Sequence, residues 1–233
     1  MRKHHRTWAP IPVLIVALLA SVVAAPSRAA DEYRIEAIAD AAPADALSEE
    51  VAALIDSSGY KVVKGASRTV CELWLCKSWP VKGDFKATDA VAYPFSQGQL
   101  IGVLRLKNKG GDFRDQEIAK GVYTLRYAQQ PVDGNHIGTS PTRDFLLLVA
   151  ADADKSAKPI ELQGLIEHSA AAAESKHPAM LALKKPKGDG AKPTLVHDEA
   201  AELWLATIAG KVEVGGKTAA LPISIVVVGH ANE

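Results

Sequence analysis

From Tyr60 to the C-terminus, the chain is a series of short apolar runs separated by Gly, Pro, Asp and Lys residues. The runs are rich in β-branched, aromatic and leucine side chains, a composition typical of strands. They are YKVV (60–63), TVCELWLCKSW (69–79), QLIGVLRLK (99–107), GVYTLRYA (121–128), DFLLLVAA (144–151), AMLAL (179–183), AELWLATIAG (201–210) and ISIVVVG (223–229). The pattern predicts a mainly β protein.

Periodicity distinguishes two kinds of strand within this series. Small or polar residues alternate with large apolar ones along GVYTLRYA: Val122, Thr124, Arg126 and Ala128 on one side, and Tyr123, Leu125 and Tyr127 on the other. Because side chains alternate in a strand, the first set predicts a face in contact with water. The runs FLLLV (145–149) and ISIVVV (223–228) are continuously apolar, so we expect both of their faces to be covered.

Two segments have the spacing of a helix. In the first, the apolar residues are spaced so that they share one face of a helix: Leu47, Val51, Leu54 and Ile55. Within residues 160–175, the expected inward face consists of Leu162, Leu165, Ile166 and Ser169, after a proline at position 159 that suits a first turn. Because the helices are few and do not alternate with the strands, we predict an antiparallel β-sandwich with two short accessory helices.

The first 29 residues have the order of a secretory signal peptide. The basic cluster MRKHHR precedes an apolar segment, and small residues, Ser27 and Ala29, precede the expected cut. A membrane anchor is the alternative, but the clean apolar part at 11–25 is shorter than the roughly 20 residues of a spanning helix. We expect residues 1–29 to be removed, 30–46 to form a flexible arm and 47–233 to form a single β-sandwich-like domain. This predicts a periplasmic or secreted protein with no membrane span after cleavage.

The charge balance argues against a nucleic-acid partner. The full chain has 27 basic and 27 acidic residues, but the first 29 residues contain four of the basic ones and no acid, which leaves 23 against 27. Nucleic-acid binding requires a basic patch or stripe, which this mildly acidic remainder does not indicate.

The segment CELWLC contains both cysteines of the chain, Cys71 and Cys76. In an extended strand, residues five positions apart face opposite sides and lie about 16 Å apart. A disulfide needs Cα atoms within about 7 Å, so an internal bond is excluded unless the segment turns. The spacing also differs from the CxxC of redox and zinc sites. We therefore expect two small buried residues with free thiols.

The sequence contains no local signature of an enzyme class. HExxH, GxSxG, GxGxxG and the P-loop pattern are absent from it. The most function-like segment is the polar loop QQPVDGNHIGTSPTR, Gln129 to Arg143, since a loop of this length in a compact β domain is often functional. Its candidate ligand-binding residues are Asp133, Asn135, His136 and Arg143. The alternative is a structured surface connection held by Asx turns.

Histidines offer a second kind of site. His136, His177 and His197 could form a metal site if the fold brought them together, because imidazole is a common ligand of zinc and copper. The alternative is that each is an isolated surface histidine. The sequence does not specify a cofactor.

Two segments, VYTLRYAQQPVDGNHIGTSPTRDFLLLV and LPISIVVVGH, resemble parts of exported bacterial proteins with no assigned activity. The resemblance implies an exported β-rich domain and no catalytic residue. Our leading hypothesis is an exported non-catalytic protein that binds an unknown ligand or an envelope protein, through the polar loop. A metal-dependent enzyme or metal carrier is the alternative, and a purely structural envelope protein is the third possibility.

Overall fold

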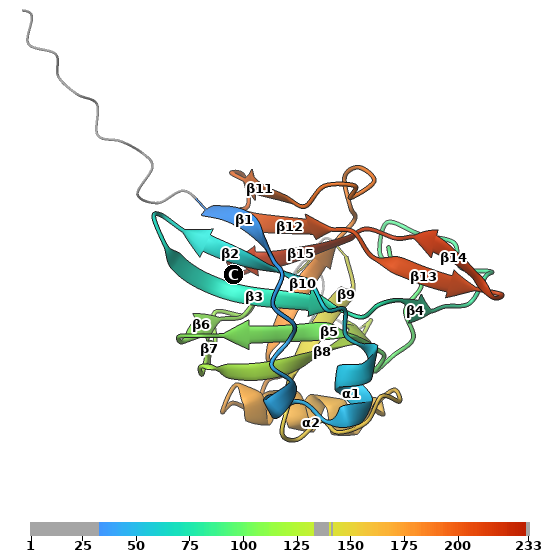
Figure 1. Ribbon diagram of the computed structural model, residues 1–233, viewed down its shortest axis with the longest axis horizontal. Coiled ribbons are helices and arrows are strands. Elements are labelled where there is room, and N and C mark those ends of the chain that lie inside the picture. The colour runs from blue at the N-terminus through green and yellow to red at the C-terminus, as the bar shows by residue number, and fades with distance from the viewer. Residues whose placement is uncertain (1–32, 133–139, 141, 232–233) are drawn as a thin grey trace, which may run out of the picture.

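A single antiparallel sheet of ten strands dominates the computed structural model, which describes residues 33–132, 140 and 142–231 (Figure 1). In spatial order the strands are β1 (Tyr33–Ile38), β2 (Gly59–Lys64), β3 (Arg68–Leu75), β5 (Leu100–Leu106), β8 (Gly121–Gln129), β9 (Asp144–Ala150), β10 (Met180–Lys184), β15 (Ile223–Val228), β12 (Leu203–Ile208) and β11 (Thr194–Asp198). Most neighbours in space are also neighbours in the chain, so the sheet grows by antiparallel addition.

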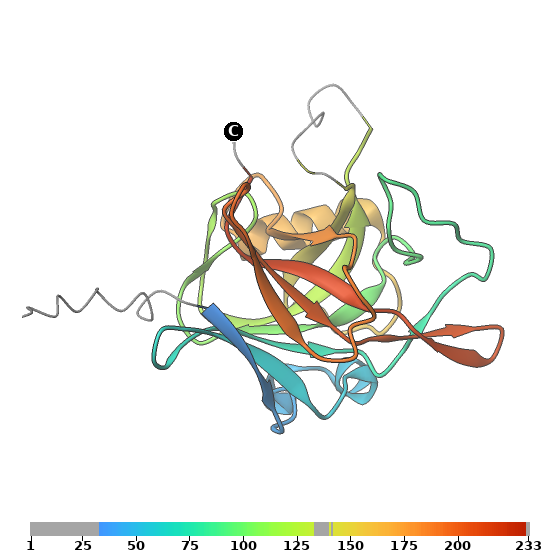
Figure 2. The same cartoon turned by 90° about the horizontal axis from the view of Figure 1, so that it is seen from above.

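The sheet curls until its two ends approach each other, so it is nearly barrel-shaped (Figures 1 and 2). At this seam the ring of Tyr33 on β1 lies 5.0 Å from the ring of Trp204 on β12. The predicted mainly β class is confirmed. The finer prediction of a sandwich is not confirmed: the ten strands form one curled sheet, because consecutive hairpins keep extending the same sheet.

Smaller elements surround the barrel. Two α-helices occur in the described chain, α1 (Glu49–Leu54) and α2 (Leu162–Ala172), where the sequence predicts them, together with the short 3₁₀ helix η2 (Ala44–Ala46). The short strands are β4 (Trp79–Pro80), β6 (Gly110–Gly111), β7 (Glu117–Ile118), β13 (Lys211–Val214) and β14 (Lys217–Ala220). Strands β13 and β14 form a hairpin that projects beside β4 (Figure 1).

The prediction of a flexible arm at 30–46 is wrong for Tyr33–Ile38. These six residues form β1 and pair with β2 along its whole length, from Tyr33 opposite Lys64 to Ile38 opposite Gly59. Tyr33, Ile35 and Ile38 pack against the main core cluster. The acidic, alanine-rich composition concealed a short strand whose stability comes from β2 rather than from its own pattern.

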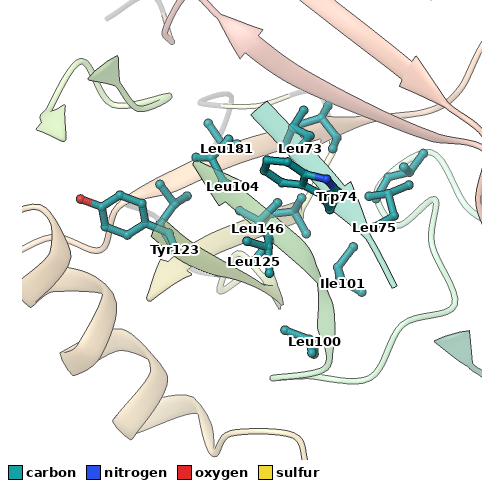
Figure 3. Packing of buried hydrophobic residues seen from close by; sticks show 14 of the residues in the cluster. Leu73, Trp74, Leu75, Leu100, Ile101, Leu104, Tyr123, Leu125, Leu146 and Leu181 are labelled. Atoms are coloured by element: carbon teal, nitrogen blue, oxygen red, sulfur yellow. The ribbon is translucent and has the colours of Figure 1, made fainter. Parts of the chain in front are cut away.

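The interior of the barrel is filled by alternate side chains from many strands. Figure 3 shows Leu104 of β5, Leu125 of β8, Leu146 of β9 and Leu181 of β10 converging there. On the outer face of β9, Leu147 and Val149 pack against Leu165 of α2, as a separate cluster. The prediction that both faces of FLLLV are covered is therefore confirmed.

One end of the barrel is closed by aromatic rings. The long connection from β4 to β5 sends Tyr93 and Phe95 inward, where Phe95 contacts the rings of Trp79, Tyr93 and Tyr127 at centroid distances of 5.1, 5.5 and 5.4 Å. The Tyr93 hydroxyl donates to the carbonyl of Lys184 at 2.9 Å and accepts from the amide of Ser224 at 2.8 Å. This aromatic plug therefore also ties β10 to β15.

The prediction of a wet face on β8 is wrong, because Thr124 and Arg126 are both 0% exposed. The guanidinium of Arg126 forms two hydrogen bonds with the carboxylate of Asp154, at 2.7 and 2.8 Å. Its remaining N–H groups donate to the backbone carbonyls of Gly98, Ser156 and Lys158. All five guanidinium donors are thus satisfied, and the segment that leads to α2 is held over the strand.

We expect Arg126→Met to lower the free energy of unfolding by about 3 to 5 kcal/mol, because the substitution leaves the Asp154 carboxylate buried without its cation. Urea denaturation followed by circular dichroism measures the change. The control is Lys61→Met, which removes a lysine that meets Glu36 at 2.9 Å on a partly exposed surface and should change stability little. Equal stability of Arg126→Met and wild type would contradict a central role for this ion pair.

A second buried carboxylate predicts a pH dependence of stability. Burial alone would raise the pKa of Glu72, but hydrogen bonds from Arg105 and Lys107 outweigh it and hold the pKa below its usual value. A lowered folded pKa adds stability that is present above the unfolded pKa of about 4.3 and is lost as the pH falls through the folded pKa.

We therefore expect Glu72→Gln to cost about 1 to 2 kcal/mol of unfolding free energy at pH 7 and almost nothing below about pH 3. Urea titrations between these pH values test this, with the more exposed Glu36→Gln as the matched control. A constant difference between wild type and Glu72→Gln at all pH values would be incompatible with the linkage.

Candidate functional site

The barrel has a cavity at the end opposite the aromatic plug. It has a volume of about 300 Å³ and lies beside the β2–β3 turn and β6. The course of β3 shows that the plug and the cavity lie at opposite ends. Its first residue, Arg68, lines the cavity, and its last residues lead to Trp79 in the plug. The cavity therefore lies at the end of the sheet that the aromatic plug does not occupy.

One part of the cavity lining is apolar and belongs to the interior of the barrel, and the other part consists of polar and glycine residues, among them Thr69, Asn108 and His230. The apolar part comes from strands that are not neighbours in the sheet, as Leu104 of β5 and Leu181 of β10 illustrate (Figure 3). The apolar lining residues are Tyr33, Val70, Cys71, Leu104, Leu106, Leu181, Val227 and Val228. All of them belong to, or pack against, the main core cluster, so this part of the cavity is a continuation of the core.

The rim of the cavity carries basic side chains. Lys64 ends β2, with its ammonium nitrogen 5.3 Å from the centre of the Tyr33 ring. Arg68 begins β3 on the other side of the turn and is exposed, with no ion-pair partner among the described residues. Lys109 also lines the rim and pairs with Glu117 at 2.5 Å. The rim thus carries both signs of charge, because Asp112 and Asp115 line it as well.

One wall of the mouth is a tight loop built around the buried Asp112. One carboxylate oxygen of Asp112 accepts hydrogen bonds from the amides of Arg114 and Gln116, at 2.9 and 2.8 Å. The other accepts from the Gln116 side chain at 2.9 Å and from the amide of Met180 at 3.0 Å. Because both oxygens are already bonded, Asp112 shapes the wall and presents little free charge to the cavity.

A second hollow lies on the outer surface beside β11. It measures about 450 Å³ and is lined by both signs of charge, including Lys184, Lys187, Asp198 and Glu199. A hydrogen bond from Lys184 at 3.2 Å lowers the pKa of Asp198 below its usual value. Lys184 and Asp198 thus compensate each other, and the hollow presents both signs of charge to a ligand.

Of the four residues predicted to bind a ligand, Asp133, Asn135 and His136 lie outside the described residues. Arg143 is described, and it fastens the base of the polar loop. Its Nε donates to the carbonyl of Gln130 at 2.8 Å, and its backbone amide donates to the carbonyl of Ala90 at 2.7 Å. These bonds give Arg143 a structural task at the start of β9.

The predicted metal ligands lie on different elements. His177 is exposed in the turn that follows α2, and His197 is on β11, where its ring stacks on Trp204 at a centroid distance of 4.6 Å. The third, His136, lies outside the described residues. Within the described part of the chain, no three His, Cys, Asp or Glu residues are grouped so that they could hold a metal.

A buried carboxylate at the plug end was not predicted. Asp144 is 0% exposed, and burial raises its pKa above the usual value. Its oxygens accept hydrogen bonds from the Tyr127 hydroxyl at 2.5 Å and the Ala92 amide at 2.7 Å. The side chain therefore anchors the β4–β5 connection to β8 and β9, away from any described cavity.

The two cysteines are free and buried, as the strand geometry predicts. Cys71 lines the cavity, whereas the Cys76 thiol donates to the carbonyl of Leu100 at 3.5 Å. Burial raises the pKa of each thiol to about 12. At neutral pH both are therefore protonated and chemically quiet.

Sequence reasoning missed the cavity because its lining comes from many separate segments. The only local signal is the pair of cations, Lys64 and Arg68, that flank the β2–β3 turn. Comparisons with protein-family models, curated proteins and solved structures found no match. Among the described helices, none is long and apolar enough to cross a membrane.

Because both thiols are buried and protonated, we expect the native protein to react slowly with an aromatic disulfide reagent at pH 8. In denaturant, two thiols per chain should react rapidly. Absorbance of the released thiolate measures both rates. Fast labelling in the native state, or fewer than two thiols after unfolding, would contradict the buried free-thiol assignment.

Proposed function

We propose that this chain is an exported, non-catalytic binding protein that holds a small molecule in the cavity at the mouth of its barrel. The observation that carries the proposal is the cavity itself, an open space of about 300 Å³ that is lined in part by core side chains and in part by polar residues. Small-molecule sites have volumes from about 300 Å³, are mostly apolar, and often lie in the mouths of β-barrels.

A packing defect is a weaker explanation of this space. Protein interiors are close-packed, and voids larger than a water molecule are few. The same barrel is filled by four aromatic rings at its other end, including the fully buried Trp79. A sequence that fills one end so completely and leaves the other hollow is typical of a barrel that encloses a ligand.

Export is supported by the sequence rather than by the fold. The order of basic, apolar and small residues in the first 29 positions is that of a signal peptide. The two buried thiols would also be protected from unwanted disulfide exchange in an oxidising compartment.

The cavity and the polar loop are separate candidate sites. Gly121 at the start of β8 pairs with Leu106 beside the cavity, whereas the loop leaves from Gln129 at the far end of the same strand. A ligand in the barrel mouth would therefore not touch the base of the loop. Variants at the two ends of β8 can distinguish the two sites.

The test is a titration of the mature protein with 1-octanol, followed by backbone amide shifts in NMR spectra. We expect saturable shifts concentrated at Cys71, Leu104 and Val227, because an apolar chain would replace water along these walls. Val70→Phe should abolish the shifts by filling the half-buried mouth.

The matched control is Val196→Phe, which adds the same ring at an exposed position of β11 that lines the outer hollow. It should leave octanol binding unchanged. Absence of saturable shifts in the wild type would overturn the proposal. Loss of binding in Val196→Phe alone would move the site to the outer hollow, and loss in His136→Ala alone would move it to the polar loop.

A further inference from the structure

We infer that the wall of the cavity contains a gate between β10 and β15, and that Phe113 is the latch that keeps this gate closed. This inference rests on the proposed function and specifies how a ligand reaches the apolar part of the cavity. It depends on the pairing of the two strands, on the bonds of the β6–β7 loop and on the burial of the lining side chains.

The two strands are hydrogen-bonded to each other over a short length. Within the described residues, β10 pairs with β15 only through its last two residues, Leu183 and Lys184. Its first three residues, Met180–Ala182, pair with β9 instead. Strand β15 continues beyond this joint along β12 as far as Val228. The first part of β10 and the last part of β15 therefore border a gap in the pairing of the sheet.

The β6–β7 loop, residues 112–116, fills this gap. On the β10 side, the Phe113 amide donates to the carbonyl of Met180 at 2.8 Å, and the Met180 amide donates to the Asp112 carboxylate at 3.0 Å. On the β15 side, the Phe113 carbonyl accepts from the amide of Ala231 at 2.9 Å, just beyond the end of the strand at Val228. Phe113 therefore takes the place of a direct bond between the two strands.

The loop is held more firmly on the β10 side than on the β15 side. A third bond on the β10 side runs from the Gln116 side-chain amide to the carbonyl of Pro178 at 3.1 Å. Among the described residues, the bond from Ala231 is the single hydrogen bond that joins the loop to the β15 side. The Phe113 ring adds apolar contact there, in one cluster with Val226. Because segments with few bonds open locally at low cost, we expect the gate to part between Phe113 and Ala231.

The closed wall covers the apolar lining of the cavity. Leu181 of β10 and Val227 of β15 line the cavity, and they are only 5% and 8% exposed. Cys71 of β3 lines the same space and is 4% exposed. A ligand that buries apolar surface must reach these side chains, whereas the closed structure offers it mainly the polar residues of the rim. Parting of β10 and β15 would uncover them, because two of the three lie on the strands that border the gap.

The test uses the Cys71 thiol as a reporter of access to the cavity. Alkylation of the mature protein by iodoacetamide at pH 8 is followed by tandem mass spectrometry, which separates Cys71 from Cys76. Ala231→Pro removes the amide that bonds to Phe113, and it should raise the Cys71 rate about five- to tenfold, the factor expected when an opening equilibrium loses one hydrogen bond. Cys76 does not line this cavity, so its rate should stay unchanged.

Two matched variants control for the substitution. Ala231→Ser keeps the backbone amide at the same position. Ala191→Pro removes an amide that bonds to Asp189 at 3.0 Å, in an exposed loop that does not line the cavity. Both should alkylate Cys71 at the wild-type rate. Equal Cys71 rates in Ala231→Pro and wild type, or an equal rise at Cys76, would overturn the gate and leave the binding function standing.

The passage of a ligand through the gate is measured with 1-octanol by NMR line shapes. In Ala231→Pro, the association and dissociation rates should both rise about five- to tenfold with a nearly unchanged dissociation constant, because a gate limits passage in both directions. Unchanged octanol rates would overturn the gate as the route of the ligand. If Cys71 responds as expected but octanol does not bind the wild type, the gate stands and the proposed function fails.

Discussion

The buried pair of Arg126 and Asp154 organises the outer side of the barrel. A guanidinium group with 0% exposure is stable only when its charge and all of its donors are compensated, and here one carboxylate and three carbonyls do so. These partners belong to the turn before β5 and to the segment after β9. The turn depends on Gly98, whose φ is +76° and where a Cβ atom would lie 1.9 Å from the carbonyl oxygen of Ile160. One side chain thus determines where α2 can begin and how β8 is covered.

The barrel combines a rigid end with an open one. At the plug end, side-chain hydrogen bonds hold the long β4–β5 connection against the sheet. The Tyr93 hydroxyl bonds to the backbone of β10 and β15, and the Asp144 carboxylate accepts from the backbone of the connection. At the other end, leucine and valine side chains of the same kind line part of the cavity, and no connection within the described residues closes it with aromatic rings. The difference between the two ends therefore lies in the loops rather than in the strands.

Local patterns predicted most of the elements, and contacts distant in the sequence account for what they missed. Runs such as DFLLLVAA and ISIVVVG carry their own strand signal, and both α-helices have clear spacing. Arg126 looked like a solvent-facing residue because its partner is 28 positions further along the chain. Curling of the sheet, the pairing of β1 and the cavity all depend on which distant segments meet. The cysteine geometry could be derived because it involves a single strand, whereas the loop ligands and the three-histidine site depend on positions outside the described residues.

The seam between the ends of the sheet has a consequence for how the molecule is made. Tyr33 and Trp204, whose rings meet there, are 171 positions apart in the chain. Contacts between such distant residues form late, because closing a large loop costs conformational entropy before the contacts contribute any stabilising free energy. The barrel can close only when strands from both ends of the chain are present together. A partly synthesised chain would therefore remain an open sheet until its last third had been added.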